Sequence, residues 1–287
     1  MRLGVCALTI AGMTPSTPLV VFTDLDGTLL DHATYGWNAA QPALDRLARL
    51  GAPVILASSK TAAEIIPIQH MMGLTGLPAI VENGAGLVGL GAGLFGNDDY
   101  TNLRRLLDDL PADLRAGFRG FADMDLPEVV ALTGLDMQAA ARARTRAYSE
   151  PGLWQGDADS RAAFLSALKA KGVTARQGGR FLTLSFGKTK ADRMDEVIAR
   201  YRPTRTLALG DAPNDIEMLE HADIGVVVAN PHHPPLPALE GDDKGRIIRT
   251  DKPGPEGWNL AVLALLNRFH PDTRPAPSQD KGPRQHG

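Results

Sequence analysis

Two aspartates separated by one residue follow an apolar segment near the N-terminus, in the run LVVFTDLDGT at residues 19–28. Side chains two apart in a strand point to the same side, so the carboxylates of Asp24 and Asp26 can face one site as the chain leaves a sheet. Two such carboxylates repel each other unless a cation or a proton lies between them. The pair therefore predicts a nucleophile, an acid–base group and part of a Mg²⁺ site.

Two simpler structures also fit the aspartate pair taken alone. Asp-Gly is a common turn, and Asp-x-Asp-Gly begins the calcium loop of an EF-hand. An EF-hand loop needs further oxygen ligands and a closing glutamate, whereas Leu29 and Leu30 follow here and the segment continues from an apolar strand. The plain turn stays open as the alternative to a catalytic site.

Further polar residues follow other short apolar runs of the chain. Runs of this kind between helical patterns are typical of parallel strands buried on both faces. The carboxyl ends of parallel strands meet at one edge of an open sheet, where ligands bind. The polar residues are Ser58, Ser59 and Lys60 after 53–57, Glu82 and Asn83 after 78–81, and Asp211, Asn214 and Asp215 after 205–209.

The order of these elements predicts an α/β protein with a Rossmann-like open parallel sheet. Helical leucine spacing covers 41–50 and ends at Gly51, and an amphipathic helix is expected over 192–201. Between them, one long segment lacks the pattern of strand and polar end. We predict a core domain from 18–86 and 188–270, an inserted mixed α/β cap at 87–187, a disordered leader at 1–17 and a disordered tail at 271–287.

Composition narrows the class of protein and its partners. The 287 residues include 30 basic and 33 acidic ones, a net charge of −3 that gives no general attraction to nucleic acid or to an anionic membrane. No segment approaches the roughly 20 apolar residues of a membrane span. The single cysteine, Cys6, excludes internal disulfides and fits a cytoplasmic location. The apolar leader lacks a convincing cleavage motif, and both Met1 and Met13 fit as the start residue.

The motifs around Asp24, Ser58, Lys188 and Asp211 together resemble the haloacid dehalogenase superfamily of phosphotransferases, and the resemblance covers nearly the whole chain. It implies that Asp24 attacks phosphorus and becomes an aspartyl phosphate. It also implies that Asp26 protonates the leaving oxygen and then deprotonates the water that hydrolyses the intermediate. The resemblance thus gives the aspartate pair an order of action.

The same resemblance implies a Mg²⁺ cofactor held at the acidic residues. Asp24, Asp211 and a backbone carbonyl near Asp26 are expected to bind the ion, and Asp215 to brace its waters. A phosphomonoester carries about two negative charges, which such an ion would neutralise as a carboxylate approaches. The segment 210–215 taken alone could also be only a turn.

The remaining expected site residues would contact phosphate. Ser58 is expected at a helix N-terminus beside the phosphoryl oxygens, where a serine can equally well cap the helix. Lys188 is assigned the fixed positive charge near the nucleophile, although Lys190 lies two residues on. Asn214 is expected to orient the nucleophile.

Four further segments carry polar or glycine-rich runs, at residues 58–61, 82–85, 148–151 and 178–181. Together they resemble the corresponding segments of the mannosyl-3-phosphoglycerate phosphatase family. The resemblance implies removal of phosphate from mannosyl-3-phosphoglycerate to give mannosylglycerate, a compatible solute. Lys60 and Arg180 are then expected partners for the carboxylate or phosphate of this small anionic substrate.

Several alternatives stay open at this stage. Gly187 and Thr189 flank Lys188 where that family often has Asp-Lys-Gly, so glucosyl-3-phosphoglycerate or another sugar phosphate is a second substrate candidate. A phosphomannomutase-like enzyme and a non-catalytic sugar-phosphate-binding protein are two further functions. The Gly-Gly-Arg run can be a hairpin turn with a surface arginine, and Glu82 and Asn83 can merely close a sheet edge. Tyr148 and Trp154 are expected in the core of the cap, and 84–89 and 185–188 as its hinges.

Overall fold

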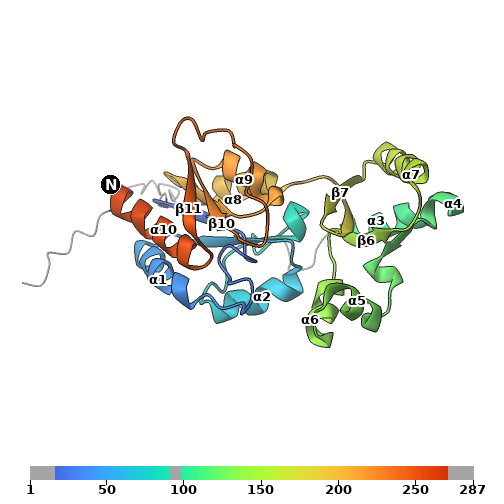
Figure 1. Cartoon of the computed structure of the whole chain (residues 1–287), viewed down its shortest axis with the longest axis horizontal. Helices are drawn as coiled ribbons and strands as arrows, with labels where there is room; N and C mark the ends of the chain where they lie inside the picture. Colours follow the sequence, from blue (N-terminus) through green and yellow to red (C-terminus); the bar gives the residue numbers. More distant parts are fainter. Residues whose placement is uncertain (1–16, 91–97, 271–287) are drawn as a thin grey trace, which may run out of the picture.

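The computed structural model describes residues 17–90 and 98–270, which form a core domain and a cap (Figure 1). The core contains a seven-stranded sheet in the order β11-β10-β9-β1-β2-β3-β4. All its neighbouring strands are parallel except β3 and β4, so the predicted α/β sheet is confirmed. The strands are β1 (Val20–Thr23), β2 (Val54–Ala57), β3 (Ala79–Val81), β4 (Gly86–Val88), β9 (Thr206–Gly210), β10 (Ile224–Ala229) and β11 (Ile247–Pro253).

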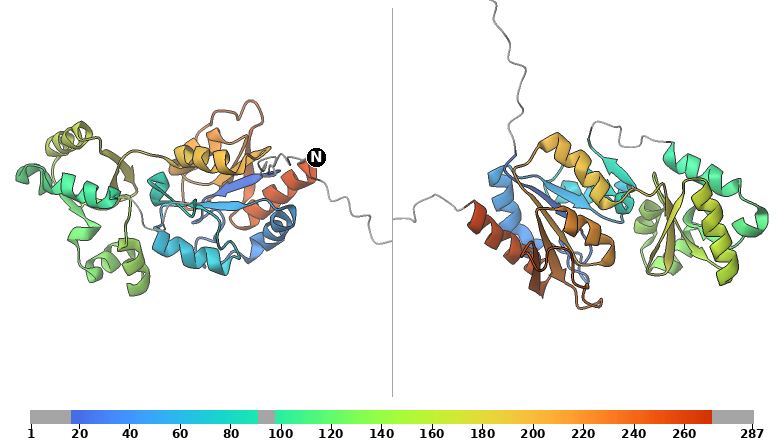
Figure 2. Two further views of the ribbon diagram at one scale, coloured as in Figure 1. Left: turned by 180° about the vertical axis from the view of Figure 1, so that it is seen from behind. Right: turned by 90° about the horizontal axis from the view of Figure 1, so that it is seen from above.

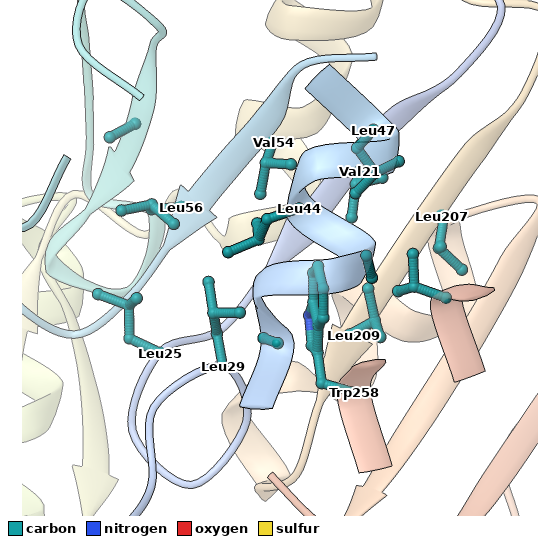
Figure 3. Packing of buried hydrophobic residues seen from close by; sticks show 14 of the residues in the cluster. Val21, Leu25, Leu29, Leu44, Leu47, Val54, Leu56, Leu207, Leu209 and Trp258 are labelled. Carbon is teal, nitrogen blue, oxygen red and sulfur yellow. The ribbon is translucent and has the colours of Figure 1, made fainter. Parts of the chain in front are cut away.

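Helices cover both faces of this sheet, α1, α2 and α10 on one face and α8 and α9 on the other (Figures 1 and 2). Figure 3 shows Leu44 of α1 and Trp258 of α10 among the buried strand residues Val21 and Leu209. Every residue of β1 is fully buried, which explains its apolar residues Val20, Val21 and Phe22. The helices are α1 (Gln41–Leu50), α2 (Ala62–Met71), α8 (Lys190–Tyr201), α9 (Ile216–His221) and α10 (Glu256–Phe269).

The strand order brings three distant segments together at one edge of the sheet. β1 lies between β9 and β2, and Thr23 at its end is opposite Leu209 of β9 and Leu56 of β2. The segments that follow these strands therefore start side by side at the point where the strand order reverses. The candidate residues of all three segments consequently lie at the same edge.

The cap has a four-stranded antiparallel sheet, in the order β5-β6-β8-β7, with helices packed against it. Trp154 lies 4.9 Å from Phe164 between ring centroids, in the apolar cluster of the cap, as expected. Its elements are α3 (Asp99–Asp108), α4 (Ala112–Arg115), β5 (Phe118–Gly120), α5 (Leu126–Thr133), α6 (Met137–Arg144), β6 (Glu150–Trp154), α7 (Ala158–Ala170), β7 (Thr174–Gly178) and β8 (Phe181–Ser185).

Two expectations about the cap need adjustment. β4 belongs to the core sheet, so the boundary expected at residue 87 falls inside a core strand. Tyr148 is buried, but in the apolar cluster of the core domain rather than that of the cap. The segment around Tyr148 is therefore attached to the core. Short 3₁₀ helices complete the structure at Asn38–Ala40, Glu82–Gly84, Phe121–Asp123 and Pro213–Asp215.

Some sequence-based expectations are not tested by this structure. Met1, Cys6 and Met13, nearly all of the predicted leader and the whole predicted tail lie outside the described residues. Within the described ranges, every helix is too short or too polar to cross a lipid bilayer.

Candidate active site

Lys190 connects two buried aspartates at the carboxyl edge of the sheet. Its Nζ lies 2.7 Å from Oδ1 of Asp24 and 2.6 Å from Oδ1 of Asp215. Asp24 follows β1, Asp215 ends the 3₁₀ turn after β9, and Lys190 is the first residue of α8. All three side chains are almost completely buried. The arrangement fixes a positive charge beside the carboxylate that the sequence analysis assigned as the nucleophile.

Local hydrogen bonds hold Asp24 in place as β1 ends. Its backbone N–H donates to the Leu209 carbonyl at 2.9 Å and so continues the ladder with β9. The Thr23 hydroxyl donates to the Asp24 carbonyl at 2.8 Å and accepts a bond from the Trp258 indole N–H at 3.0 Å. The backbone that carries Asp24 is thus fixed on both sides.

Asp211 is held by two donors that the sequence analysis did not assign. The Thr28 hydroxyl donates to its Oδ1 at 2.5 Å, and Asn230 donates to its Oδ2 at 2.6 Å. The turn before Thr28 requires glycine, because Gly27 has a φ of +82° and a Cβ there would lie 2.8 Å from Nδ2 of Asn230. Both carboxylate oxygens of Asp211 are therefore oriented by neighbouring side chains.

Asp215 organises its own loop as well as Lys190. Its Oδ2 accepts hydrogen bonds from the backbone N–H groups of Asp211 and Ala212, each at 3.1 Å. With Lys190 on Oδ1, the two oxygens accept three hydrogen bonds. Asp215 therefore orients both the lysine and the segment that carries Asp211.

The carboxylates of Asp24, Asp211 and Asp215 form a group in which one oxygen of each lies within 4.8 Å of the others. Burial raises the pKa of Asp24 well above its ordinary value; Lys190 opposes this rise and Asp215 adds to it. Burial also raises the pKa of Asp211, against its hydrogen bonds from Thr28 and Asn230. Lys190 pairs with two of these three buried carboxyl groups, so the group has one lysine for three acids. Hard oxygen donors in such a cluster fit Mg²⁺.

Lys190 stays protonated in spite of its burial. Desolvation lowers its pKa, but the charges of Asp215 and Asp24, with their hydrogen bonds, raise it above the ordinary value of a lysine. A buried ammonium group with two carboxylate partners is the arrangement that makes such burial tolerable.

Asp26 lies in a separate part of the site, in contact with Lys60. Oδ2 of Asp26 is 2.8 Å from the Lys60 ammonium, and its Oδ1 is buried with no hydrogen-bond partner among the described residues. Burial lowers the pKa of Lys60, but attraction to Asp26 outweighs it and the net shift is upward. The Lys60 ammonium also lies 5.4 Å from the ring centroid of the exposed Tyr35. The carboxylate of Asp26 is not part of the three-aspartate group.

The Ser58 hydroxyl is buried beside this pair, whereas Ser59 is exposed. Oγ of Ser58 accepts a bond from the backbone N–H of Lys60 at 3.3 Å. Thr61, not Ser58, caps α2, in a capping box with Glu64. The capping alternative for Ser58 is therefore wrong.

Asn83 reaches the site, but Glu82 points away from it. Oδ1 of Asn83 accepts a bond at 3.2 Å from Nδ2 of Asn214, which is exposed at the turn after β9. Glu82 is buried and its carboxylate binds residues 146–149 of the chain, at distances of 2.7 to 3.3 Å. Both carboxylate oxygens of Glu82 accept hydrogen bonds from that segment. The predicted contact of Glu82 with substrate is therefore wrong, because its carboxylate joins the cap to the core instead.

The structure does not place Lys188 beside the nucleophile, contrary to the prediction. Lys188 is about half exposed and pairs with Glu196 at 3.1 Å. It precedes α8, whereas Lys190, Met194 and Val197 lie on the buried face of that helix. A helix places residues i, i+4 and i+7 on one face, and this spacing could have identified Lys190 from the sequence.

Arg180 lies outside the site as well. It is at the tip of the hairpin between β7 and β8, is exposed, and donates to the carbonyl of Leu132 at 2.6 Å. The hairpin alternative for the Gly-Gly-Arg run is confirmed. Its predicted contact with a substrate anion is not supported in this arrangement of the cap, because the guanidinium is used within the cap.

The residues missed by the sequence analysis are Lys190, Thr28 and Asn230. Thr28 completes the Asp-Gly-Thr run in the turn after β1, and Asn230 directly follows the buried strand β10, so both were visible as polar residues beyond a strand. Their common partner, Asp211, lies 183 positions from Thr28 and 19 from Asn230. The pairing itself required the folded chain.

Comparison with known proteins identifies the family. The family model for haloacid dehalogenase-like hydrolases matches residues 21–88 and 160–236, just over half of the chain. The chain therefore belongs to the haloacid dehalogenase-like hydrolases.

Solved structures share the fold along nearly their whole length. A hypothetical protein from Geobacillus kaustophilus HTA426 has a TM-score of 0.62 at 21% identity, covering 86% of this chain and 98% of that one. The subclass IIB sugar phosphatase BT4131 has a TM-score of 0.56 at 17% identity, covering 87% and 98%. The sucrose-phosphatase of Synechocystis sp. PCC6803, solved with sucrose and phosphate, has a TM-score of 0.54 at 16% identity, covering 88% and 98%. At these identities the likeness concerns the fold alone.

Proposed function

We propose that this hydrolase is a Mg²⁺-dependent phosphatase that converts mannosyl-3-phosphoglycerate to mannosylglycerate and phosphate. The observation that supports phosphatase chemistry most directly is Lys190 between Asp24 and Asp215, at 2.7 and 2.6 Å, beside Asp211. A carboxylate can attack an anionic phosphomonoester only where positive charge is already fixed at the site. The sugar-phosphatase names of two proteins of the same fold agree with a phosphorylated sugar as substrate.

In the proposed reaction, an oxygen of Asp24 attacks phosphorus, and the bond from phosphorus to the glycerate oxygen breaks. Asp26 donates a proton to that leaving oxygen. Asp26 then takes a proton from water, whose oxygen attacks phosphorus and releases Asp24 and inorganic phosphate. Lys190 holds the nucleophile in place and balances its charge in both steps.

The residues around phosphate have supporting roles in this proposal. Ser58 and the backbone beside Ser59 bind phosphoryl oxygens, and Asn214, held by Asn83, orients the reacting groups. Asp24, Asp211 and the backbone carbonyl of Asp26 would hold Mg²⁺, which neutralises the approaching phosphate when bound. Asp215 anchors Lys190 and would brace the waters of such an ion.

The leaving group would lie on the side of Asp26, because that residue supplies its proton. Lys60 contacts Asp26 at 2.8 Å and supplies a positive charge there, which suits the glycerate carboxylate. Of the residues predicted to determine specificity, Lys60 is thus still proposed to contact the carboxylate of the substrate. A small anionic substrate of this kind fits the cytoplasmic location that the single cysteine favours.

The test is phosphate release by the purified full chain from mannosyl- and glucosyl-3-phosphoglycerate, with hexose phosphates as a wider panel. We expect the highest kcat/KM for the mannosyl substrate and loss of turnover when EDTA is added. A preference for the glucosyl substrate would replace the proposed sugar and keep the chemistry. Isomerised sugar phosphate formed only with a bisphosphorylated activator would indicate a phosphomutase, and inactivity on every substrate would overturn the proposal.

A further inference from the structure

The turn at Glu82–Gly84 has an unusual backbone. Glu82 and Asn83 have φ values of +52° and +58°, and Gly84 follows with +91°. Residues other than glycine rarely adopt positive φ, and two in succession persist only where the surroundings fix them. The contacts of this turn supply that constraint.

The first two residues of the turn hold the phosphate-binding loop predicted at 58–60. The backbone N–H of Glu82 donates to the Lys60 carbonyl, and that of Asn83 donates to the Ser58 carbonyl, each at 2.9 Å. The Asn83 side chain accepts from Asn214 on the opposite side of the site. The turn therefore connects the loop after β2 with the loop after β9.

The end of the turn packs on the first residues of α8. A Cβ at Gly84 would lie 2.3 Å from the backbone nitrogen of Lys190, so only glycine fits. Arg193 donates to the carbonyls of Gly84 and Ala85, at 3.0 and 2.6 Å. A shift of the turn would consequently move the helix start that carries Lys190.

The Glu82 carboxylate fastens this turn to a segment of the insert. It accepts bonds from the backbone N–H groups of Ala147 and Ser149 at 2.9 and 2.8 Å and from the Ser149 hydroxyl at 2.7 Å. Arg146 contacts it at 3.2 Å. Glu82 is only 2% exposed, so this is a desolvated, charge-assisted junction.

We propose that Glu82 is a positioning residue. Its contacts with Arg146 and Ser149 hold the turn in place. The turn then positions the groups that contact phosphate. The junction also attaches the cap to the core apart from the two chain crossings, together with the hydrogen bond from the Thr61 hydroxyl to the Arg142 carbonyl at 2.9 Å. Any cap motion must then leave residues 146–149 on the core and bend beyond them. The catalytic part of this inference rests on the proposed phosphatase function.

The first test compares Glu82→Ala and Glu82→Gln with a matched control. Glu217→Ala removes another core carboxylate that pairs with a cap arginine, Arg176 at 3.2 Å, but both of those side chains are about half exposed. With mannosyl-3-phosphoglycerate and with 4-nitrophenyl phosphate, we expect Glu82→Ala to lower kcat about 100-fold and Glu82→Gln about tenfold, the range seen for residues that orient reacting groups. Glu217→Ala should stay within about twofold.

The fall is expected in kcat on both substrates, because the turn orients the reacting groups rather than the sugar. Glu82→Ala with a lower unfolding midpoint and an unchanged kcat would overturn the proposal. If Glu82→Ala does not fold, Ser149→Ala removes one donor to Glu82, together with an acceptor of Arg146, and should lower kcat about two- to fivefold. An unchanged kcat in a folded Ser149→Ala would then count against the proposal.

The attachment of the cap through Glu82 is tested without substrate. Spin labels at Lys169→Cys in the cap and Arg49→Cys in the core, with Cys6→Ser, report the distance between the two domains. Glu82→Gln should broaden the distance distribution and Glu217→Ala should not; equal distributions in all variants would contradict the attachment. Because this readout needs no turnover, it stands even if every phosphorylated substrate proves inactive and the proposed function fails.

Discussion

The core domain and the cap both bury charged side chains, but the balance of charge differs between them. In the core, Lys190 pairs with Asp24 and Asp215, and Asp211 is the third carboxyl group of the same cluster. In the cap, the partly buried Arg104 and Arg115 lie 2.6 and 2.8 Å from the partly buried Asp123.

The buried Glu150 of the cap is likewise satisfied. It accepts from the Tyr100 hydroxyl at 2.6 Å and from the backbone N–H of Ala122 at 2.9 Å. Charges that are already paired contribute to structure, whereas an excess of one sign can bind a ligand. The difference in charge balance is consistent with the proposed chemistry in the core.

The largest expected effect comes from the nucleophile. Asp24→Asn should lower kcat by about 10⁴-fold or more, because an amide oxygen cannot form the acyl phosphate. Phosphate release measures this, and unchanged circular dichroism shows that the fold is intact. Asp251→Asn, at an exposed acid of β11, is the control. Retained turnover in Asp24→Asn would move the nucleophile elsewhere.

The two lysines near the start of α8 provide the next test. Lys190→Met should lower kcat about 10³-fold and destabilise the fold by about 3–5 kcal/mol, because it leaves two buried carboxylates without their counter-charge. Lys188→Met should change kcat less than about twofold, since Lys188 is exposed. The kcat and the free energy of unfolding in urea, measured for both variants, test these expectations. A larger loss of kcat in Lys188→Met than in Lys190→Met would show that Lys188 supplies the positive charge near the nucleophile.

Removing a donor to Asp211 should affect metal binding more than turnover. Thr28→Val deletes the hydroxyl on Oδ1 and should raise the Mg²⁺ concentration for half-maximal activity about tenfold, as for other residues that orient ligands. Thr34→Val removes an exposed hydroxyl of the following loop and serves as control. If Thr28→Val and wild type need the same Mg²⁺ concentration for half-maximal activity, Asp211 does not bind the metal as proposed.

The paired charges of the cap predict sensitivity to acid. Burial opposes ionisation of Asp123, but hydrogen bonds from Arg104 and Arg115 outweigh it and lower its pKa to about 2. The folded cap therefore gains stability from this carboxylate above its ordinary pKa of 3.8, and loses it as the pH falls to about 2.

Hydrogen exchange of the segment that includes β5 should accordingly rise about tenfold in wild type as the pH falls through this window, after correction for the intrinsic rate. Asp123→Asn should show no such change, because it has no carboxylate to protonate. Equal pH profiles for the two proteins would mean that Asp123 does not stabilise the cap.

The smallest effect is expected at the cap hairpin. Arg180→Ala should change kcat/KM for any phosphorylated substrate less than about twofold, because the guanidinium is exposed and bonded within the cap. Steady-state kinetics with the mannosyl substrate measures this. A tenfold loss would show that the hairpin reaches the substrate in a closed form and would restore the predicted role of Arg180.

Much of the fold and part of the site follow from the sequence by itself. Buried parallel strands carry continuous apolar runs because both faces are covered, and polar residues after such runs must lie at one sheet edge. This reasoning located Asp24, Asp26, Ser58 and Asp211, and local periodicity is enough for it. The alternation of strands and helices with one interruption also predicted the inserted α/β cap.

The tertiary structure decided which charges meet. Lys190 lies 166 positions from Asp24 and Glu82 lies 67 from Ser149, so no local pattern relates the partners. Lys188 and Arg180 are equally charged in the sequence, but they point to solvent or to their own domain. Residue type and spacing predict burial and the face of an element, whereas pairing depends on how the elements pack, which only the folded chain specifies.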